Sequence, residues 1–250
     1  MDQTIYILRH GQTAWNAKDK ERHQTHSNGR ENFLTEKGLR QVDEAAKSLR
    51  DAELNYAFHS PLLRASQTLR RILKDRIPIP TYEVPALTEM SMAFLDGMNQ
   101  AEWEKEFPQT IPLYAARKND KFGCKLPEGI DYSGCFERAK QIARDNNEPG
   151  KVIPAWENYE DVVKRTKGFI DELTLFGDSS ILISGHQGLN RALLGNLLVG
   201  SAHLGSIESI VDLETPNAAV FRVERSSDGV KLCHNLGKGW IPGFITKKNE

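Results

Sequence analysis

Arginine and histidine side chains lie directly beyond three short apolar runs of the chain. Arg9 and His10 follow the first run, Arg64 lies one turn into the helix expected after the second, and His186 follows the third. Guanidinium groups bind phosphate through paired N–H donors, and two guanidinium and two imidazole groups aimed at one crevice would form an anion clamp. If folding brings these residues together, the sequence predicts a local anion site in a chain of nearly neutral net charge.

The three apolar runs, at 5–8, 54–58 and 181–183, have the length and composition of buried strands. In an open α/β sheet, ligands bind in the crevice beyond the carboxyl ends of the strands. Gly11 would let the backbone approach a ligand closely there, and the helices that begin after the second and third runs would add N–H groups suited to phosphate. We therefore expect a phosphoryl group as the occupant.

Apolar runs alternate with amphipathic segments from end to end, which is typical of an α/β fold. Helices are expected at 39–49, 61–73, 162–173 and 189–199, and further strands at 206–213, 218–223 and 230–234. The expected architecture is a three-layer α/β/α sandwich with a mostly parallel central sheet. The chain of 250 residues is expected to form a single domain, 1–250, with an inserted lid-like segment at about 109–153.

The segment at 109–153 loses this alternation and is rich in Lys, Asp, Asn, Gly and Pro, with one weak helical stretch near 136–143. Long irregular segments are often functional. A lid over the site is one interpretation, and a surface elaboration without a role in the chemistry is the other. Its basic and acidic side chains, among them Arg117, would allow it to close over a phosphorylated small molecule.

Composition excludes several classes of protein. With 33 basic and 34 acidic residues the net charge is −1, which gives no support for nucleic acid or an anionic membrane as a partner. The most apolar stretch, 181–205, is interrupted by His186, Asn190 and Arg191, so no transmembrane segment is predicted. The first residues lack the basic start and long apolar stretch of a secretory signal, and we expect a cytoplasmic protein.

The cysteine and histidine spacing predicts no metal site. Cys124, Cys135 and Cys233 lack Cys-x-x-Cys spacing, so neither a disulfide framework nor a zinc site is expected. His23 and His26 form a His-x-x-His pair, but no acidic or cysteine partner lies at ligand spacing, and we expect both to be solvated loop residues. The unassigned edge strand leaves both a monomer and a homodimer open.

Four motifs carry the candidate residues. They are LRHGQTAWN at 8–16, SPLLRASQT at 60–68, LTE at 87–89 and SGH at 184–186. In this order they resemble the signatures of the histidine phosphatase superfamily, in its phosphoglycerate mutase-like branch. A single Arg-His-Gly would be weak support, whereas four motifs in register are strong support for the resemblance.

The resemblance implies a role for each core residue. His10 would attack phosphorus and form a phosphohistidine that water then hydrolyses, with Arg9, Arg64 and His186 holding the equatorial oxygens. One ring nitrogen of His10 must then be unprotonated, which a hydrogen bond from the other nitrogen to a backbone carbonyl would enforce. Glu89 would protonate the leaving oxygen and later activate water. The cationic side chains supply the positive charge, so no cofactor is expected.

Five further residues are expected to bind the substrate. Asn16 matches the Trp-Asn of the first motif and would donate to the phosphate, with Gly11 and Gln187 beside the two histidines. Arg22 and Gln24 resemble the Arg-x-Gln that family phosphatases carry soon after the first motif. The glycine usual after that Gln is a threonine here, and the segment is longer than in the family.

Three functions are compared on the resemblance. After Glu89 the sequence MSMAFLDGM looks like the phosphatases' Glu-x-x-x-Gly-x-Trp-Glu-Gly, with Ala93 for Gly and Leu95 for Trp, and the mutases' Glu-Arg-His-Tyr-Gly is absent. This favours a metal-independent phosphomonoesterase that acts on a small phosphorylated metabolite. A cofactor-dependent phosphoglycerate mutase is the first alternative. A catalytically inactive module that binds phosphate esters is the second, although every core residue is present.

Overall fold

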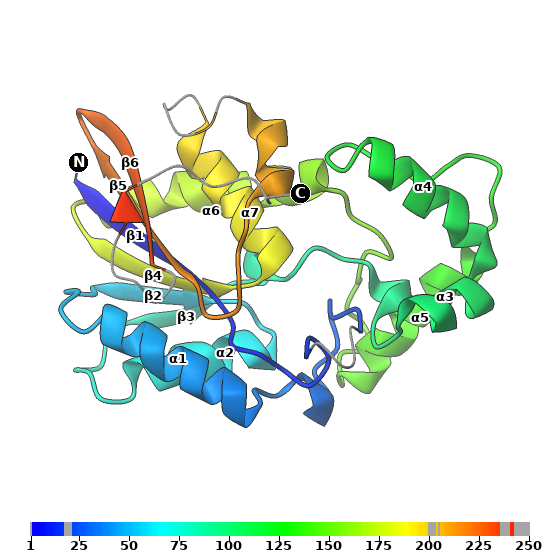
Figure 1. The fold of residues 1–250 in the computed structure, drawn as a ribbon, viewed down its shortest axis with the longest axis horizontal. Helices are drawn as coiled ribbons and strands as arrows, with labels where there is room; N and C mark the ends of the chain where they lie inside the picture. Colours follow the sequence, from blue (N-terminus) through cyan, green and yellow to red (C-terminus); the bar gives the residue numbers. More distant parts are fainter. Residues whose placement is uncertain (1, 18–21, 200–203, 205, 236–240, 243–250) are drawn as a thin grey trace.

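A seven-stranded sheet forms the centre of the computed structural model, which describes residues 2–17, 22–199, 204, 206–235 and 241–242 (Figure 1). The strands in these ranges are β1 (Gln3–Arg9), β2 (Tyr56–His59), β3 (Thr81–Glu83), β4 (Ser180–Gly185), β5 (Val220–Ser226), β6 (Gly229–Asn235) and β7 (Ile241–Pro242). The helices are α1 (Glu36–Ser48), α2 (Leu63–Leu73), α3 (Gln100–Glu106), α4 (Ile111–Asn119), α5 (Ser133–Asp145), α6 (Tyr159–Glu172) and α7 (Gln187–Leu198).

The strand order is β3-β2-β4-β1-β5-β6-β7. Strands β1 to β4 run in parallel, β5 is antiparallel to β1, and β6 is antiparallel to β5 and so runs with the first four. Arg9 pairs with Gly185, and His59 pairs with Ser184. The strands β1, β4 and β2 therefore end at one level, and the segments that follow them start from the same edge of the sheet.

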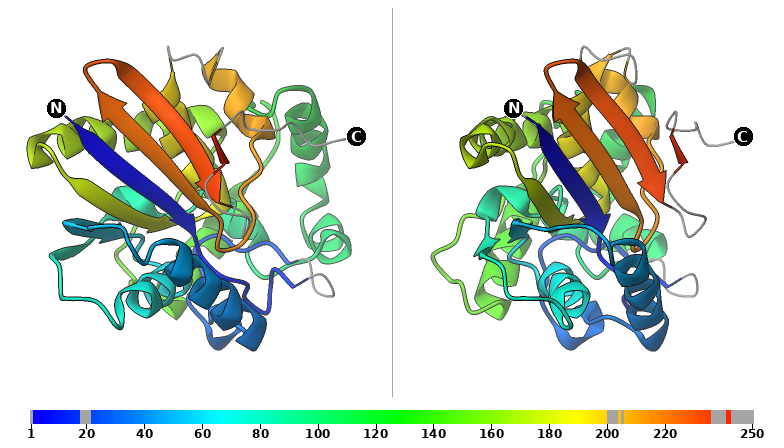
Figure 2. Two further views of the ribbon diagram at one scale, coloured as in Figure 1. Left: turned by 60° about the vertical axis from the view of Figure 1, so that its left-hand side comes forward. Right: turned by 90° about the vertical axis from the view of Figure 1, so that its left-hand side faces the viewer.

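Helices cover both faces of the sheet (Figures 1 and 2). On one face, Tyr6 and Leu8 of β1 pack in a cluster with Val42 of α1 and Leu69 of α2. The alternate residues of the same strand, at 5 and 7, face a second cluster formed with α6 and α7. This alternation follows from the period of two along a strand. The three-layer α/β/α sandwich with a mostly parallel sheet is confirmed.

The strand expected at 206–213 is wrong. Residues 207–212 form a 3-10 helix, and its buried Ile210 packs against Gly195 of α7, where a Cβ would lie 2.8 Å from the Ile210 Cγ2 atom. Ile207, Ile210 and Leu213 recur every three residues, which is the period of a 3-10 helix. The apolar composition of this segment is also typical of a strand, which explains the wrong prediction. In the structure the strand that pairs with β1 on this side is β5.

The segment at 109–153 is more regular than expected. The helical stretch near 136–143 corresponds to α5, but α4 was not predicted, and α3 precedes the segment. Phe94, Trp103, Phe107 and Leu113 share a buried apolar cluster with residues of the α5 region, apart from the two clusters that cover the sheet. Helices α3 to α5 therefore form an excursion with its own core, beside the main sheet in Figure 1. Among the described residues, no helix is long and apolar enough to cross a membrane.

Candidate active site

His10 lies directly beyond β1 with its imidazole buried. Its Nδ1 atom is 2.8 Å from the carbonyl oxygen of Gly11. Because a carbonyl can only accept, Nδ1 carries the proton and Nε2 is left with a free lone pair. Burial, together with the positive charges of Arg64 and Arg9, holds the pKa of His10 well below 6.5. The imidazole is therefore neutral and nucleophilic at neutral pH.

Gly11 lies where the chain passes close to α1. A Cβ at Gly11 would lie 2.6 Å from the carbonyl oxygen of Gly38 and 2.9 Å from Val42 in α1. The missing side chain thus allows the chain to pass close to α1, and the Gly11 carbonyl fixes the ring of His10.

The half-buried Arg9 and the fully buried Arg64 bring two guanidinium groups to His10. The Arg9 Nη1 atom donates to the Thr215 carbonyl at 2.8 Å, and the Arg64 Nη2 atom donates to the Thr25 carbonyl at 2.8 Å. The Nε atoms of both residues and Nη1 of Arg64 are buried without a partner among the described residues. Burial lowers the pKa of each arginine to about 10, so both stay charged. Unpaired buried donors of this kind favour an anion.

A buried carboxylate, Asp96, supports Arg64 from a distance. It accepts hydrogen bonds from the backbone N–H groups of Thr25, His26 and Ser27 at 2.5 to 2.7 Å. The same short loop supplies the carbonyl that holds Arg64. Burial raises the pKa of Asp96, while the three N–H donors and Arg64 act in the opposite direction. Asp96 therefore fixes the loop that orients Arg64.

His186 is the N-cap residue of α7 and is fully buried. Its ring centroid lies 5.3 Å from that of His10. Its Nε2 atom is 2.8 Å from Oγ of Ser60, and that oxygen also accepts the N–H of Leu62. The hydroxyl proton of Ser60 can then go to Nε2, which leaves Nδ1 protonated and without a partner in the described part of the chain. Burial and the charge of Arg64 hold the pKa of His186 well below 6.5.

Glu89 lies against the N-terminus of α7. Its carboxylate accepts the N–H groups of Gly188 at 3.2 Å and Leu189 at 2.9 Å, and that of Met90 at 2.8 Å. A Cβ at Gly188 would lie 2.9 Å from a Glu89 oxygen, so a glycine is needed for this approach. The first N–H groups of α7 thus fix the position of the Glu89 carboxyl group.

Most of the predicted site residues line one cavity of about 290 Å³. Its walls include Arg9, His10, Asn16, Arg22, Gln24, Glu89 and Gln187. Asn16 accepts the N–H of Thr13 through its side-chain oxygen, and its amide nitrogen is buried without a partner among the described residues. Asn16 therefore has a free donor at the cavity.

Arg22 and Gln24 reach the wall of the cavity with their polar groups already engaged. Arg22 makes a bidentate ion pair with Glu102 of α3, at 2.6 and 2.8 Å. Gln24 accepts the hydroxyl of Thr13 at 3.0 Å and donates to the side chain of Asn32. The charge of Arg22 is thus neutralised, and both side chains tie the loop after the first motif to its surroundings.

The expectation that His23 and His26 are solvated is wrong for His26, whereas His23 is half-buried and lines the cavity. His26 is 5% exposed, and neither ring nitrogen has a partner among the described residues. Burial and nearby positive charges lower the pKa of His26 to about 3 and that of His23 to about 4. His23 is paired with the hydroxyl of Tyr114 at 3.0 Å. Residues distant in the sequence contact this loop, as where the Asn146 side chain donates to the His26 carbonyl at 2.8 Å, and the local sequence does not indicate such contacts.

The buried state of His26 predicts that stability falls in acid. Between pH 6.5 and pH 3 the unfolded chain binds a proton at His26 that the folded chain does not bind. The free energy of unfolding is therefore unaffected by this residue above pH 6.5 and decreases as the pH falls below that value. Each such group contributes up to about 1.4 kcal/mol per pH unit. Urea unfolding at pH 7, 6 and 5 should show this slope, and His26→Phe should reduce it. An unchanged slope in the variant would contradict the assignment.

Three residues that the sequence interpretation did not place in the site face the same cavity. Arg191 donates to the Leu213 carbonyl at 2.7 Å and to the Tyr159 hydroxyl at 2.6 Å. Arg117 of α4 lies with its guanidinium 5.5 Å from the centre of the Trp156 ring. Arg117, Tyr159 and Arg191 also line an adjoining cavity of about 500 Å³. The only sequence signal for Arg191 is its position one helical turn after Gln187.

Solved structures with the same fold include phosphatases. A putative alpha-ribazole-5'-P phosphatase from Escherichia coli has a TM-score of 0.68 and 20% identity, and covers 92% of this chain and 94% of its own. A mycobacterial glucosyl-3-phosphoglycerate phosphatase has a TM-score of 0.63 and 20% identity, and covers 98% and 99%. At this identity the comparison establishes the fold.

Among curated proteins, relatives are named 2,3-bisphosphoglycerate-dependent phosphoglycerate mutase. The one from Neisseria gonorrhoeae is 26% identical over 237 residues, which cover 91% of this chain and 96% of the relative. The one from Parabacteroides distasonis is 28% identical over 245 residues, covering 95% and 92%. The model of the histidine phosphatase superfamily (branch 1) matches residues 5–148 and 128–235. With this match over most of its length, the chain belongs to the histidine phosphatase superfamily.

Proposed function

We propose that this protein is a phosphomonoesterase that hydrolyses a small phosphorylated metabolite through a phosphohistidine at His10. The observation that carries the proposal is the neutral His10 ring among buried donors of Arg9, Arg64 and His186 that have no partner in the described ranges. A phosphoryl group would satisfy these donors and face the free lone pair. Positioned cationic donors are the main source of catalysis in phosphoryl transfer, so the proposed reaction uses no metal or cofactor.

The proposed reaction has two displacements. In the first, Nε2 of His10 forms a bond to phosphorus, the bond from phosphorus to the ester oxygen breaks, and Glu89 gives a proton to that leaving oxygen. In the second, Glu89 takes a proton from water, the water oxygen bonds to phosphorus, and the bond from phosphorus to Nε2 breaks. Inorganic phosphate leaves, and His10 returns to its starting state.

The charge around the cavity supports a phosphatase more than a mutase. A mutase has to retain a bisphosphate, which calls for additional free cations around the site. Here Arg22 is neutralised by Glu102, and Met90 and Met92 give the cavity apolar lining. The curated relatives keep mutase activity as the second candidate, and the guanidinium groups of Arg117 and Arg191 at the cavity are the features that favour it.

We further propose that the excursion selects the substrate. Helix α4 contributes Arg117 to the wall of the cavity and Tyr114 to the adjoining one. The part of the ester beyond the phosphate would lie between these residues and Arg191. In this proposal the excursion belongs to the catalytic domain, and the substrate is a small molecule rather than a nucleic acid or a membrane.

A direct assay separates the three candidate functions. The protein should release phosphate from 4-nitrophenyl phosphate, and it should leave the isomer ratio unchanged when it is given 3-phosphoglycerate with a trace of 2,3-bisphosphoglycerate. Phosphorus NMR follows both isomers and free phosphate in one sample. Equilibration of the isomers faster than phosphate release would establish a mutase. Tight binding of the ester without turnover would establish a binding module.

A further inference from the structure

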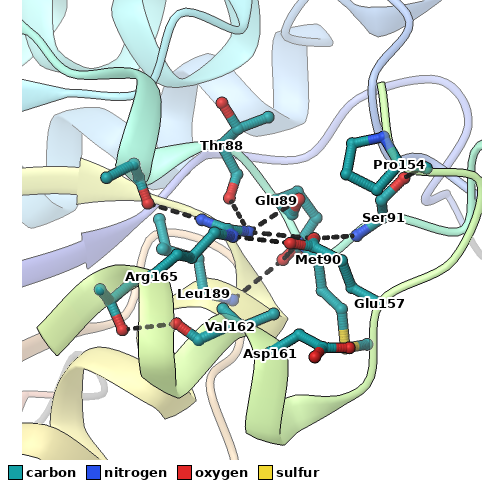
Figure 3. A network of polar contacts seen from close by, with 12 residues as sticks. Thr88, Glu89, Met90, Ser91, Pro154, Glu157, Asp161, Val162, Arg165 and Leu189 are labelled. Atoms are coloured by element: carbon teal, nitrogen blue, oxygen red, sulfur yellow. Dashed lines mark hydrogen bonds and ion pairs between the residues drawn. The ribbon is translucent and has the colours of Figure 1, made fainter. Parts of the chain in front are cut away.

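An ion pair between Arg165 of α6 and Glu157, which precedes this helix, holds the segment that carries Glu89 (Figure 3). The guanidinium of Arg165 donates to the backbone carbonyls of Ala86 at 2.6 Å, Thr88 at 2.7 Å and Glu89 at 3.2 Å. The same group donates to the carboxylate of Glu157, at 2.9 and 3.3 Å. One side chain thus contacts the backbone just before Glu89 and Glu89 itself.

Glu157 holds the other side of the same segment. Its carboxylate accepts the N–H of Ser91 at 2.8 Å, and its own backbone N–H donates to the Ser91 carbonyl at 2.8 Å. The Ser91 hydroxyl donates to the carbonyl of Pro154. Glu157 lies directly before Asn158, the N-cap residue of α6, so the helix start fixes it. The backbone is therefore held on both sides of Glu89, by Arg165 within α6 and by Glu157 just before this helix.

The arrangement divides the contacts of Glu89 between two packed helices. Helix α7 binds the carboxylate through its first N–H groups, and α6, which packs on α7, binds the backbone through Arg165. The side chains of Arg165 and Glu157 are only 24% and 10% exposed. A buried ion pair adds little net stability compared with apolar packing, whereas its fixed geometry determines where the segment lies.

We infer that Arg165 and Glu157 are positioning residues for proton transfer by Glu89. The inference rests on the proposed function, because it requires Glu89 to donate a proton to the leaving oxygen. Displacement of a catalytic group by about 1 Å can cost on the order of 10²-fold in rate. Loss of the ion pair then affects mainly those substrates whose leaving group needs that proton.

The test compares kcat/KM for two aryl phosphates in the intact protein. Phenyl phosphate has a leaving group that needs a proton, and 2,4-dinitrophenyl phosphate has one that leaves without it. Because kcat/KM reports only the steps up to cleavage of the ester bond, the later hydrolysis of phosphohistidine does not enter. Arg165→Lys should lose on the order of 10²-fold with phenyl phosphate, and should stay within about threefold with 2,4-dinitrophenyl phosphate.

Glu157→Gln is the second variant, which keeps an acceptor for Ser91 and removes the charge. Like Arg165→Lys, it should lose more kcat/KM with phenyl phosphate than with 2,4-dinitrophenyl phosphate, but the loss on phenyl phosphate should be smaller, about tenfold. Arg76→Lys is the matched control, because Arg76 also donates to two backbone carbonyls, those of Ala52 and Leu49, away from the site. This control should lose no more with one substrate than with the other.

Glu89→Gln makes the outcomes distinguishable. A positioning role predicts that Arg165→Lys costs little more when Glu89→Gln is already present, because both changes remove one proton transfer. Equal losses on both substrates in Arg165→Lys and Glu157→Gln, with a preferential loss in Glu89→Gln, would overturn the inference alone. Equal losses in Glu89→Gln itself would overturn the proton-donor role in the proposed function and the inference with it.

Discussion

His10→Ala is expected to abolish phosphate release while the protein stays folded. The variant removes the atom that would bond to phosphorus, and loss of a covalent nucleophile costs on the order of 10⁶-fold in rate. The deleted ring makes one hydrogen bond, to Gly11, so the surrounding fold retains its other contacts. Phosphate release from an aryl phosphate and the circular dichroism spectrum measure the two effects.

His59→Ala is the matched control for this variant. His59 ends β2 and makes the same kind of contact as His10, with its Nδ1 atom 2.8 Å from the carbonyl of the following residue, Ser60. It does not line the cavity of the candidate site. The His59→Ala variant should therefore keep its activity. In the wild-type protein, phosphate label that is trapped on the enzyme from a radioactive ester should be released by acid, because the P–N bond is acid-labile. Appreciable turnover by His10→Ala, or label that is stable to acid, would contradict the assignment of His10 as the nucleophile.

Arg64→Met is expected to lower kcat/KM by about 10² to 10³-fold, which is the usual cost of removing a preorganised donor for transition-state charge. Arg64 is fully buried, and two of its nitrogens have no partner among the described residues. The loop that it contacts keeps its bonds to Asp96, so the loss should fall on the chemistry rather than on folding.

Inorganic phosphate provides a readout for Arg64 that does not depend on turnover. Phosphate at 100 times its Kd should stabilise the wild-type protein by about 2.7 kcal/mol, visible as a higher melting temperature. Arg64→Met should remove most of this shift. Arg70→Met, one turn and a half further along α2 on its exposed side, should keep it. A full phosphate shift in Arg64→Met would contradict the placement of Arg64 at the anion.

The main features of the sheet could be predicted because short buried strands leave a strong local signal. The apolar runs at 5–8 and 181–183 are confirmed within β1 and β4, and their order places polar junctions at one edge. The 3-10 helix at 207–212 was missed because a short apolar segment fits either structure when its neighbours are unknown. Helix α4 was missed because nine residues give little periodicity, and packing on other helices supplies its stability.

The residues of the candidate site also differ in whether the local sequence indicates them. His10 and His186 could be found because they directly follow strands, and the sheet alone brings their rings to 5.3 Å. Arg165 carries no such signal, because a guanidinium on a helix surface is usually solvated and only the fold brings it to the carbonyls beside Glu89. His26 is similar, since residues far along the chain bury it. Roles that depend on contacts between distant segments could not be read from local pattern.

The separate apolar core of the excursion has a consequence for how such an enzyme diversifies. Trp103, Phe107 and Leu113 stabilise the wall above the cavity, while the strands that end at His10 and His186 are stabilised by other side chains. If the excursion selects the substrate as proposed, sequence drift within α3 to α5 changes what the protein accepts while the strands that carry His10 and His186 keep their own packing. New specificity would then require no change at the proposed reacting centre.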